Sequence, residues 1–88
     1  MSWNIQFTER ARKELKKLDN QVAVRIGKEL KKLSGFDDPA QHCKALTGQY
    51  SGLWRYRAGD YRVIIDLDRE QLVILALDID HRSKIYRS

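Results

Sequence analysis

Three strand-like runs in the second half of the chain constrain the fold more than any other feature. They span residues 53–58, 61–67 and 71–79, and they are rich in β-branched and aromatic side chains. Short polar turns separate them, Gly-Asp at 59–60 and Asp-Arg-Glu at 68–70, and such turns join neighbouring antiparallel strands. The last run is apolar on both faces, which is typical of a strand inside a sheet. These residues predict an antiparallel meander.

The first half of the chain predicts one strand and two helices. Residues 3–7 alternate apolar and polar side chains, the period of a half-buried strand. Thr8 is suited to cap a helix that continues to about residue 20, and a second helix is expected over 21–33 with an apolar stripe and a basic outer surface. Residues 36–52 lack a clear period and predict an irregular connection.

The order of these elements is βααβββ, which predicts an α+β fold. We expect two layers, an N-terminal helical hairpin packed on a mainly antiparallel four-stranded sheet. Eighty-eight residues with 42% hydrophobic side chains are close to the lower size at which one core is stable without cross-links. The chain is therefore expected to form a single domain over residues 1–88.

The charge of the chain indicates the class of its partners. Seventeen Lys and Arg against twelve Asp and Glu give a formal charge of +5, which favours nucleic acid, an acidic protein or a membrane surface. The single cysteine, Cys43, excludes an internal disulfide, and no secretion signal opens the chain. The longest strongly apolar stretch, 72–77, is far shorter than the roughly 20 residues of a membrane span. A soluble, cytoplasmic protein that does not enter a membrane is expected.

Cationic side chains are concentrated in the predicted meander and after it. Alternation along a strand places Arg55 and Arg57 on the same face, and Arg62 follows the first hairpin turn. If the strands pair as neighbours, these cations converge, and guanidinium groups bind phosphate oxygens in pairs. The same arginines are also explained as solvated charges that protect a sheet edge. Further candidates near the chain end are His81, Arg82, Lys84, Tyr86 and Arg87.

Three segments together resemble the RelE branch of the RelE/ParE toxin superfamily. They are Lys-Ala-Leu-Thr-Gly at 44–48, Trp-Arg-Tyr-Arg-Ala-Gly-Asp-Tyr-Arg-Val-Ile-Ile at 54–65 and His-Arg-Ser-Lys-Ile-Tyr-Arg at 81–87. With the early helices, the similarity covers nearly the whole chain. The resemblance implies the toxin of a type II toxin–antitoxin system, an endoribonuclease that cuts mRNA in the ribosomal A site without a metal and thereby inhibits translation.

The resemblance also implies roles for individual residues. Arg62, Arg82 and Arg55 match family positions that would clamp the phosphate during cleavage. Tyr86 matches a tyrosine near the chain end that would stack on a base or accept a proton. The RNA-binding residues expected beside this site are Lys44, Arg57, His81, Lys84 and Arg87.

One position departs from the family pattern. Several members have a second basic residue two positions before Arg55, where this chain has Leu53. The general base therefore stays open between Tyr86 and His81, an imidazole that titrates near neutrality.

No metal or other cofactor is expected. His42 and Cys43 are adjacent and isolated, whereas a zinc site needs about four spaced ligands. The expected partners are a RelB-like antitoxin, mRNA and the ribosome, with operator DNA reached only indirectly through the antitoxin. Two alternatives stay open: a ParE-like inhibitor of DNA gyrase without nuclease activity, and a catalytically silent corepressor that only binds its antitoxin.

Overall fold

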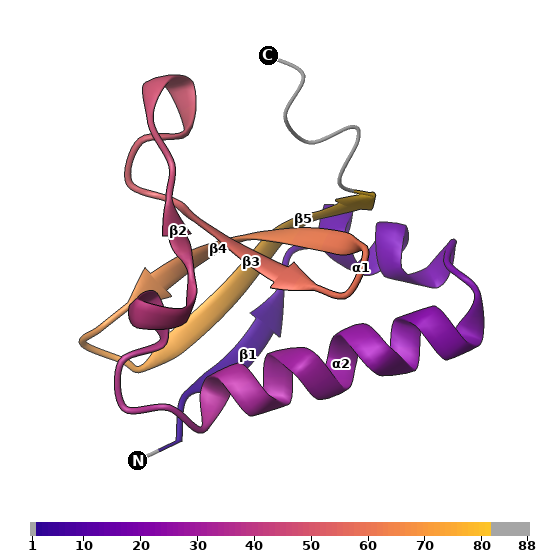
Figure 1. Cartoon of the computed structure of the whole chain (residues 1–88), viewed down its shortest axis with the longest axis horizontal. Coiled ribbons are helices and arrows are strands. Elements are labelled where there is room, and N and C mark those ends of the chain that lie inside the picture. The colour runs from indigo at the N-terminus through magenta and orange to yellow at the C-terminus, as the bar shows by residue number, and fades with distance from the viewer. Residues whose placement is uncertain (1, 82–88) are drawn as a thin grey trace.

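A five-stranded sheet with two helices forms the fold (Figure 1). The structure, a computed structural model, describes residues 2–81. The strands are ordered β1-β5-β4-β3-β2 across the sheet, and every pair is antiparallel except β1 with β5. The elements are β1 (Asn4–Phe7), α1 (Glu9–Lys16), α2 (Asn20–Ser34), the 3₁₀ helix η1 (Pro39–His42), β2 (Lys44–Ala45), the 3₁₀ helix η2 (Gly48–Tyr50), β3 (Trp54–Ala58), β4 (Tyr61–Asp68) and β5 (Val73–His81).

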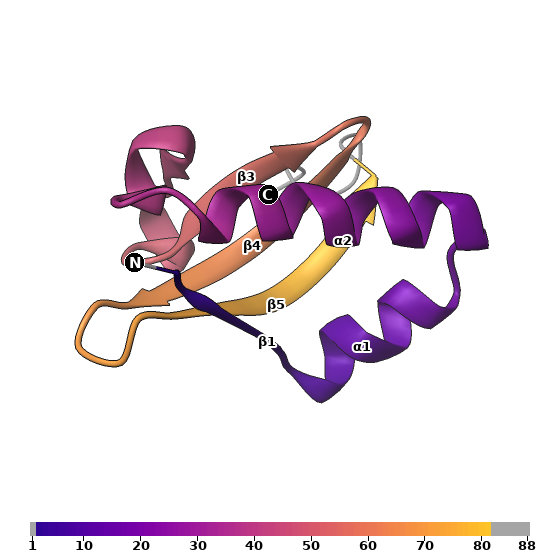
Figure 2. The same ribbon diagram turned by 90° about the horizontal axis from the view of Figure 1, so that it is seen from below.

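The helix α2 lies across one face of the sheet and closes the hydrophobic core (Figure 2). Its inward side chains Ile26, Leu30 and Leu33 are almost fully buried, as the apolar stripe predicts. The hydroxyl of Tyr56 on β3 donates a hydrogen bond of 3.1 Å to the carbonyl of Glu29 in α2, which joins the two layers. The sheet contributes Tyr56, Ala58, Val63, Ile65, Ile74, Ala76 and Ile79 to this core.

The helix α1 lies along the edge of β5 rather than beside α2. The parallel pairing of β1 covers only the first half of β5, from Val73 to Ala76. Beyond it, the Thr8 hydroxyl donates to the carbonyl of Leu77 (3.3 Å), and the backbone N–H of Ile79 donates to Glu14 Oε1 (3.1 Å). Side chains at the start of α1 and within it therefore satisfy backbone groups that a longer β1 would otherwise pair.

The predicted fold class was wrong in three respects. The sheet has five strands, because the expected connection contains the edge strand β2, in which Lys44 pairs with Arg55 and Ala45 with Trp54. It is mixed, because β1 pairs in parallel with β5. The helices do not form the expected hairpin on the sheet, because α1 is held to the edge of β5 while α2 covers the face.

The hairpin between β3 and β4 turns through two residues, Gly59 and Asp60. Gly59 has φ of +65°, a left-handed conformation that glycine adopts without strain. A Cβ at this position would lie 3.3 Å from Nε of Arg25 in α2. The turn therefore lies close under α2, and a larger residue would be strained there. In residues 2–81, neither helix is long and apolar enough to cross a membrane.

Candidate functional site

The face of the sheet opposite α2, here called the open face, carries the predicted cations. Along β3 the side chains of Tyr56 and Ala58 enter the core, so alternation turns Arg55 and Arg57 to the open face. Arg57 is directly opposite Arg62 on β4, and directly paired residues point to the same side of a sheet. Three of the predicted site residues are thus neighbours on one surface.

The short strand β2 adds a fourth cation to this surface. Lys44 is paired with Arg55 in the antiparallel register, so both side chains lie on the open face. Lys44 and Arg57 are exposed, while Arg55 and Arg62 are partly buried. Lys44, Arg55, Arg57 and Arg62 are called the cationic cluster below. Close positive charges of this kind attract polyanions and bind phosphate oxygens.

The strand β5 places carboxylates next to the cationic cluster. Asp80 is paired with Arg62, and Asp78 is paired with Ile64. Both aspartates therefore face the open side, and the positive surface ends at β5. The open face has a cationic half on β2, β3 and β4 and an acidic boundary along β5.

His81 lies apart from the cationic cluster. It is paired with Tyr61, and the two rings meet edge to face with centroids 5.4 Å apart. Tyr61 packs against the core, so this pair belongs to the side of the sheet opposite Arg62. The other predicted residues, Arg82, Lys84, Tyr86 and Arg87, lie outside the described residues.

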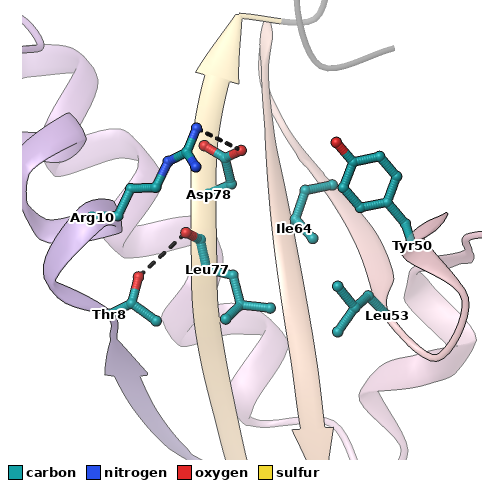
Figure 3. Close-up of a pocket in the computed structure, with 7 residues that line it drawn as sticks. All are labelled: Thr8, Arg10, Tyr50, Leu53, Ile64, Leu77 and Asp78. Carbon is teal, nitrogen blue, oxygen red and sulfur yellow. Dashed lines mark hydrogen bonds and ion pairs between the residues drawn. The ribbon is translucent and has the colours of Figure 1, made fainter. Parts of the chain in front are cut away.

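A cavity of about 400 Å³ opens on the same face beside the cationic cluster (Figure 3). Its floor is apolar and includes Ile64, which is only 3% exposed although it faces away from α2. A register shift between Ile64 and Ile65 leaves Leu77 as an extra residue on β5, and its side chain lines the cavity with that of Asp78. The full lining is Thr8, Arg10, Tyr50, Leu53, Ile64, Leu77 and Asp78.

The polar wall of this cavity consists of Thr8, Arg10 and Asp78, and Glu14 lies next to Asp78 outside the lining. Burial, and then a hydrogen bond with Asp78, raises the pKa of Glu14, against the opposing effect of the Ile79 N–H. Asp78 Oδ1 is buried beside Glu14 and receives no hydrogen bond from an amide, hydroxyl or cation within residues 2–81. Arg10 Nη2 lies 3.8 Å from Asp78 Oδ2.

Comparison with known proteins places the chain in a family. Residues 5–86 match the profile of the ParE toxin of type II toxin–antitoxin systems, parDE. Toxin RelG of Mycobacterium tuberculosis is 31% identical over 91 residues, which cover 99% of both chains. The chain belongs to this family of type II toxins.

Solved structures agree with a RelE-like toxin. A chain of the RelBE2 toxin–antitoxin complex from Mycobacterium tuberculosis is 28% identical and superposes with a TM-score of 0.83 over 93% of this chain and 100% of that chain. A chain of the archaeal RelE–RelB complex from Pyrococcus horikoshii OT3 is 26% identical, with a TM-score of 0.75 over 96% and 99% of the two chains. The protein is therefore a RelE-like toxin of a type II toxin–antitoxin system.

Three residues at or next to the cavity, Asp78, Glu14 and Tyr50, were not among the predicted site residues. Asp78 gives a signal, because it is the first carboxylate after the apolar residues 72–77. Glu14 gives none, since it is one of several charged residues on α1 and lies 65 positions from its partner Ile79. Tyr50 is 37% exposed at the end of η2, in the segment expected to be irregular.

The toxin holds its cysteine in an unreactive form. Burial, with a smaller contribution from Asp38, raises the pKa of the Cys43 thiol to about 11. The thiolate is the nucleophilic form of cysteine, so Cys43 is poorly suited to catalysis near neutral pH. Within residues 2–81, no three His, Cys, Asp or Glu side chains are grouped as metal ligands would be.

Proposed function

We propose that the toxin is an endoribonuclease that cuts mRNA in the ribosomal A site and so inhibits translation. The observation that carries the proposal is the cationic cluster, in which β2, β3 and β4 bring Lys44, Arg55, Arg57 and Arg62 onto one open face. RNA cleavage needs cations that stabilise the negative charge developing on the phosphate. The likeness to Toxin RelG and to a RelE chain supports the same activity.

The proposed chemistry uses side chains alone. Arg62 and Arg55 would contact the scissile phosphate, with Arg82 completing the clamp and Tyr86 next to the attacking 2′-hydroxyl. Lys44 and Arg57 would hold the neighbouring RNA backbone, with Lys84 and Arg87 as further contacts, whereas His81 packs on Tyr61 on the other side of the sheet and is left out of this proposal. No metal or other cofactor takes part in this proposal, and the whole of residues 1–88 would act as one toxin domain.

The partners follow from the same reasoning. The two solved relatives are parts of the RelBE2 and RelE–RelB complexes, and we propose a RelB-like antitoxin for this toxin. An amphipathic helix with an acidic polar side would complement either the basic helices or the cationic cluster. The toxin would act in the cytoplasm, where it meets mRNA and ribosomes, and would reach operator DNA only through its antitoxin.

Inhibition of DNA gyrase is the second candidate function. One observation favours it, because the matching family profile is that of ParE toxins. A gyrase inhibitor needs a binding surface but no cleavage chemistry. It would stop DNA supercoiling in vitro and would leave every RNA intact.

The test of the proposed function is primer extension on a reporter mRNA in a cell-free translation system, with and without ribosomes. We expect cuts at codon-spaced positions only when ribosomes are present. Arg62→Ala should reduce cleavage by about 10²-fold or more, because removal of one charge stabiliser from a transition state has an effect of this size. Arg12→Ala is the matched control, since Arg12 is an exposed arginine on α1.

The outcomes separate the two candidates. Cuts that persist in Arg62→Ala would contradict the role of Arg62. If the folded wild-type chain makes no cuts but inhibits gyrase in a supercoiling assay, the nuclease proposal fails and the second candidate is correct. Activity in neither assay would leave only the antitoxin-binding role.

A further inference from the structure

We propose that the cavity beside the cationic cluster is a nucleobase-binding subsite that prefers bases with an exocyclic amino group, with Asp78 as the hydrogen-bond acceptor. The inference rests on the proposed function, because it names a specificity subsite on the surface that would bind RNA. It assigns a role to the cavity, which the cleavage chemistry leaves unused.

The shape and the apolar lining of the cavity suit a planar ring. Its volume of about 400 Å³ lies within the range of small-ligand pockets. Ile64, Leu53 and Leu77 provide an apolar floor, and the Tyr50 ring stands at one side of it (Figure 3). Bases in single-stranded RNA commonly stack on exposed aromatic side chains, and Tyr50 is available for such a contact.

The cavity is continuous with the cationic cluster. Leu53 precedes Arg55 by two positions, which places both on the open face. Ile64 is paired with Arg55 and follows Arg62 by two positions on the same strand. A nucleotide whose phosphate contacts Arg55 or Arg62 would therefore have its base next to the cavity floor, which makes RNA the occupant that the charges favour.

The polar groups of the lining are mostly engaged. Thr8 Oγ1 accepts a hydrogen bond from the N–H of Ala11 at the start of α1 and donates to the Leu77 carbonyl. Asp78 Oδ1 is buried beside Glu14. Asp78 Oδ2 lies 3.8 Å from Arg10 Nη2, and this distance is too long for a strong hydrogen bond. The Asp78 side chain is 29% exposed. This oxygen can accept a hydrogen bond from a ligand.

A carboxylate oxygen discriminates among the bases. Ionised aspartate only accepts hydrogen bonds, and adenine, cytosine and guanine each offer an amino group as donor. Uracil offers a single N–H between two carbonyl oxygens, and these oxygens are repelled by the negative charge of the carboxylate. Glu14 acts as a positioning residue here, because its Oε1 accepts a hydrogen bond from the N–H of Ile79, the residue after Asp78, and so holds α1 against the edge of β5.

The experiment titrates the full-length toxin with the four nucleoside 3′-monophosphates at pH 7 and follows backbone amide signals by NMR. The phosphate is the same in all four ligands, so a difference in affinity reports on the base. We expect the adenosine, cytidine and guanosine ligands to shift the Leu77 and Asp78 amides. They should bind about tenfold more tightly than the uridine ligand, because a hydrogen bond to a charged group has an effect of this size.

Asp78→Asn provides the decisive variant. An asparagine amide both donates and accepts, so uridine 3′-monophosphate should gain affinity and the preference should fall below about twofold. Asp66→Asn is the matched control, because Asp66 is an exposed carboxylate on the open face, outside the cavity lining. It should keep the wild-type preference.

Three results would overturn the subsite. The first is equal affinity for all four ligands, and the second is shifts confined to the cationic cluster. The third is a combination of two observations: the nucleotides do not shift the Leu77 and Asp78 amide signals, and Asp78→Asn loses antitoxin binding. This result would assign the cavity to a protein partner. None depends on cleavage: selective binding without RNA cuts would refute the proposed function alone, and cuts without selective binding would refute the subsite alone.

Discussion

The two faces of the sheet are built from the same strands but have opposite properties. The face under α2 is apolar and almost fully buried, and its side chains form one core with Ile26, Leu30 and Leu33. The open face carries the cationic cluster, the acidic boundary on β5 and a cavity with an apolar floor. On β3, Tyr56 belongs to the first face while its neighbours Arg55 and Arg57 belong to the second.

Within one strand, therefore, the side chains on the covered face contribute to stability and those on the open face are available for binding. Burial of apolar surface supplies most of the folding free energy, and the covered face holds most of that surface. The open face is then free to carry charges that repel one another, which is a cost to folding but useful for binding an anion. Ile64 is the exception, because it is buried on the open face as the floor of the cavity. Substitutions on the two faces should therefore have different effects.

The largest effect is expected from a truncation on the covered face. Ile74 is fully buried in the middle of the sheet, and Ile74→Ala should lower the free energy of unfolding by about 2–5 kcal/mol. Urea denaturation followed by circular dichroism measures it. Val24→Ala, at a residue 49% exposed on α2, should change stability by less than about 0.5 kcal/mol. Equal losses in both variants would refute the assignment of the core.

A smaller effect is expected at the hydrogen bond between the layers. Tyr56→Phe removes the bond to Glu29 and should cost about 1 kcal/mol. Burial raises the pKa of Tyr56 to about 12, above the value of about 10 of an unfolded tyrosine. The unfolded state ionises first, so this stabilisation is complete below pH 10 and is lost between about pH 10 and 12.

Unfolding measurements at several pH values test this prediction. The difference in stability between the wild type and Tyr56→Phe should be constant from pH 7 to 9 and should decrease above pH 10. A difference that stays constant through pH 11 would contradict the raised pKa. Tyr50→Phe, at an exposed ring, should change the free energy of unfolding at pH 7 by less than about 0.5 kcal/mol.

A smaller, pH-dependent effect on the free energy of unfolding is expected at Glu14, where α1 meets the edge of β5. Burial and the Asp78 hydrogen bond raise the pKa of Glu14 above its usual 4.5. The stabilisation from this proton is present below pH 4.5 and is lost as the pH rises through the raised value. Glu14→Gln retains an acceptor for Ile79 and cannot ionise, so its stability relative to the wild type should increase as the pH rises through that value.

The control for this prediction is on the same helix. Glu9 is exposed and pairs only weakly with Lys13 at 3.8 Å. Glu9→Gln removes the same charge from α1 without changing the contact with Ile79, so it controls for the loss of a charge from the helix. If Glu14→Gln behaved like Glu9→Gln, the raised pKa of Glu14 would be contradicted.

Local patterns in the sequence predicted most elements but not their arrangement. The Thr8 cap, the stripe on α2 and the turn at Gly59 act over a few residues, and each lies close to its predicted place. The two-residue strand β2 is too short to show a period. The parallel pairing of β1 with β5 joins positions about 69 apart, and no local pattern encodes it.

The features of the candidate site can likewise be divided into those that local patterns predict and those that depend on tertiary packing. Alternation along β3 and one hairpin turn are enough to place Arg55, Arg57 and Arg62 together. Lys44 joins them only through β2. The cavity depends on a register shift in β5 and on Tyr50 from η2, both of which arise from tertiary packing. The sequence alone therefore predicted the cationic residues of the site but not the cavity beside them.

The smallest effect on stability, with a clear effect on binding, is expected at Arg57. Its side chain is exposed, and its Nε donates a 3.4 Å hydrogen bond to the Gly59 carbonyl, so Arg57→Ala should change the free energy of unfolding by less than about 0.5 kcal/mol. If Arg57 neutralises one phosphate, the slope of log affinity for single-stranded RNA against log salt should decrease by about 0.7. Fluorescence anisotropy with a labelled oligonucleotide at four salt concentrations measures this slope. Arg12→Ala on α1 should leave the slope unchanged. An equal decrease of the slope in both variants would mean that RNA binding depends only on the net charge of the toxin and not on the side chains of the open face.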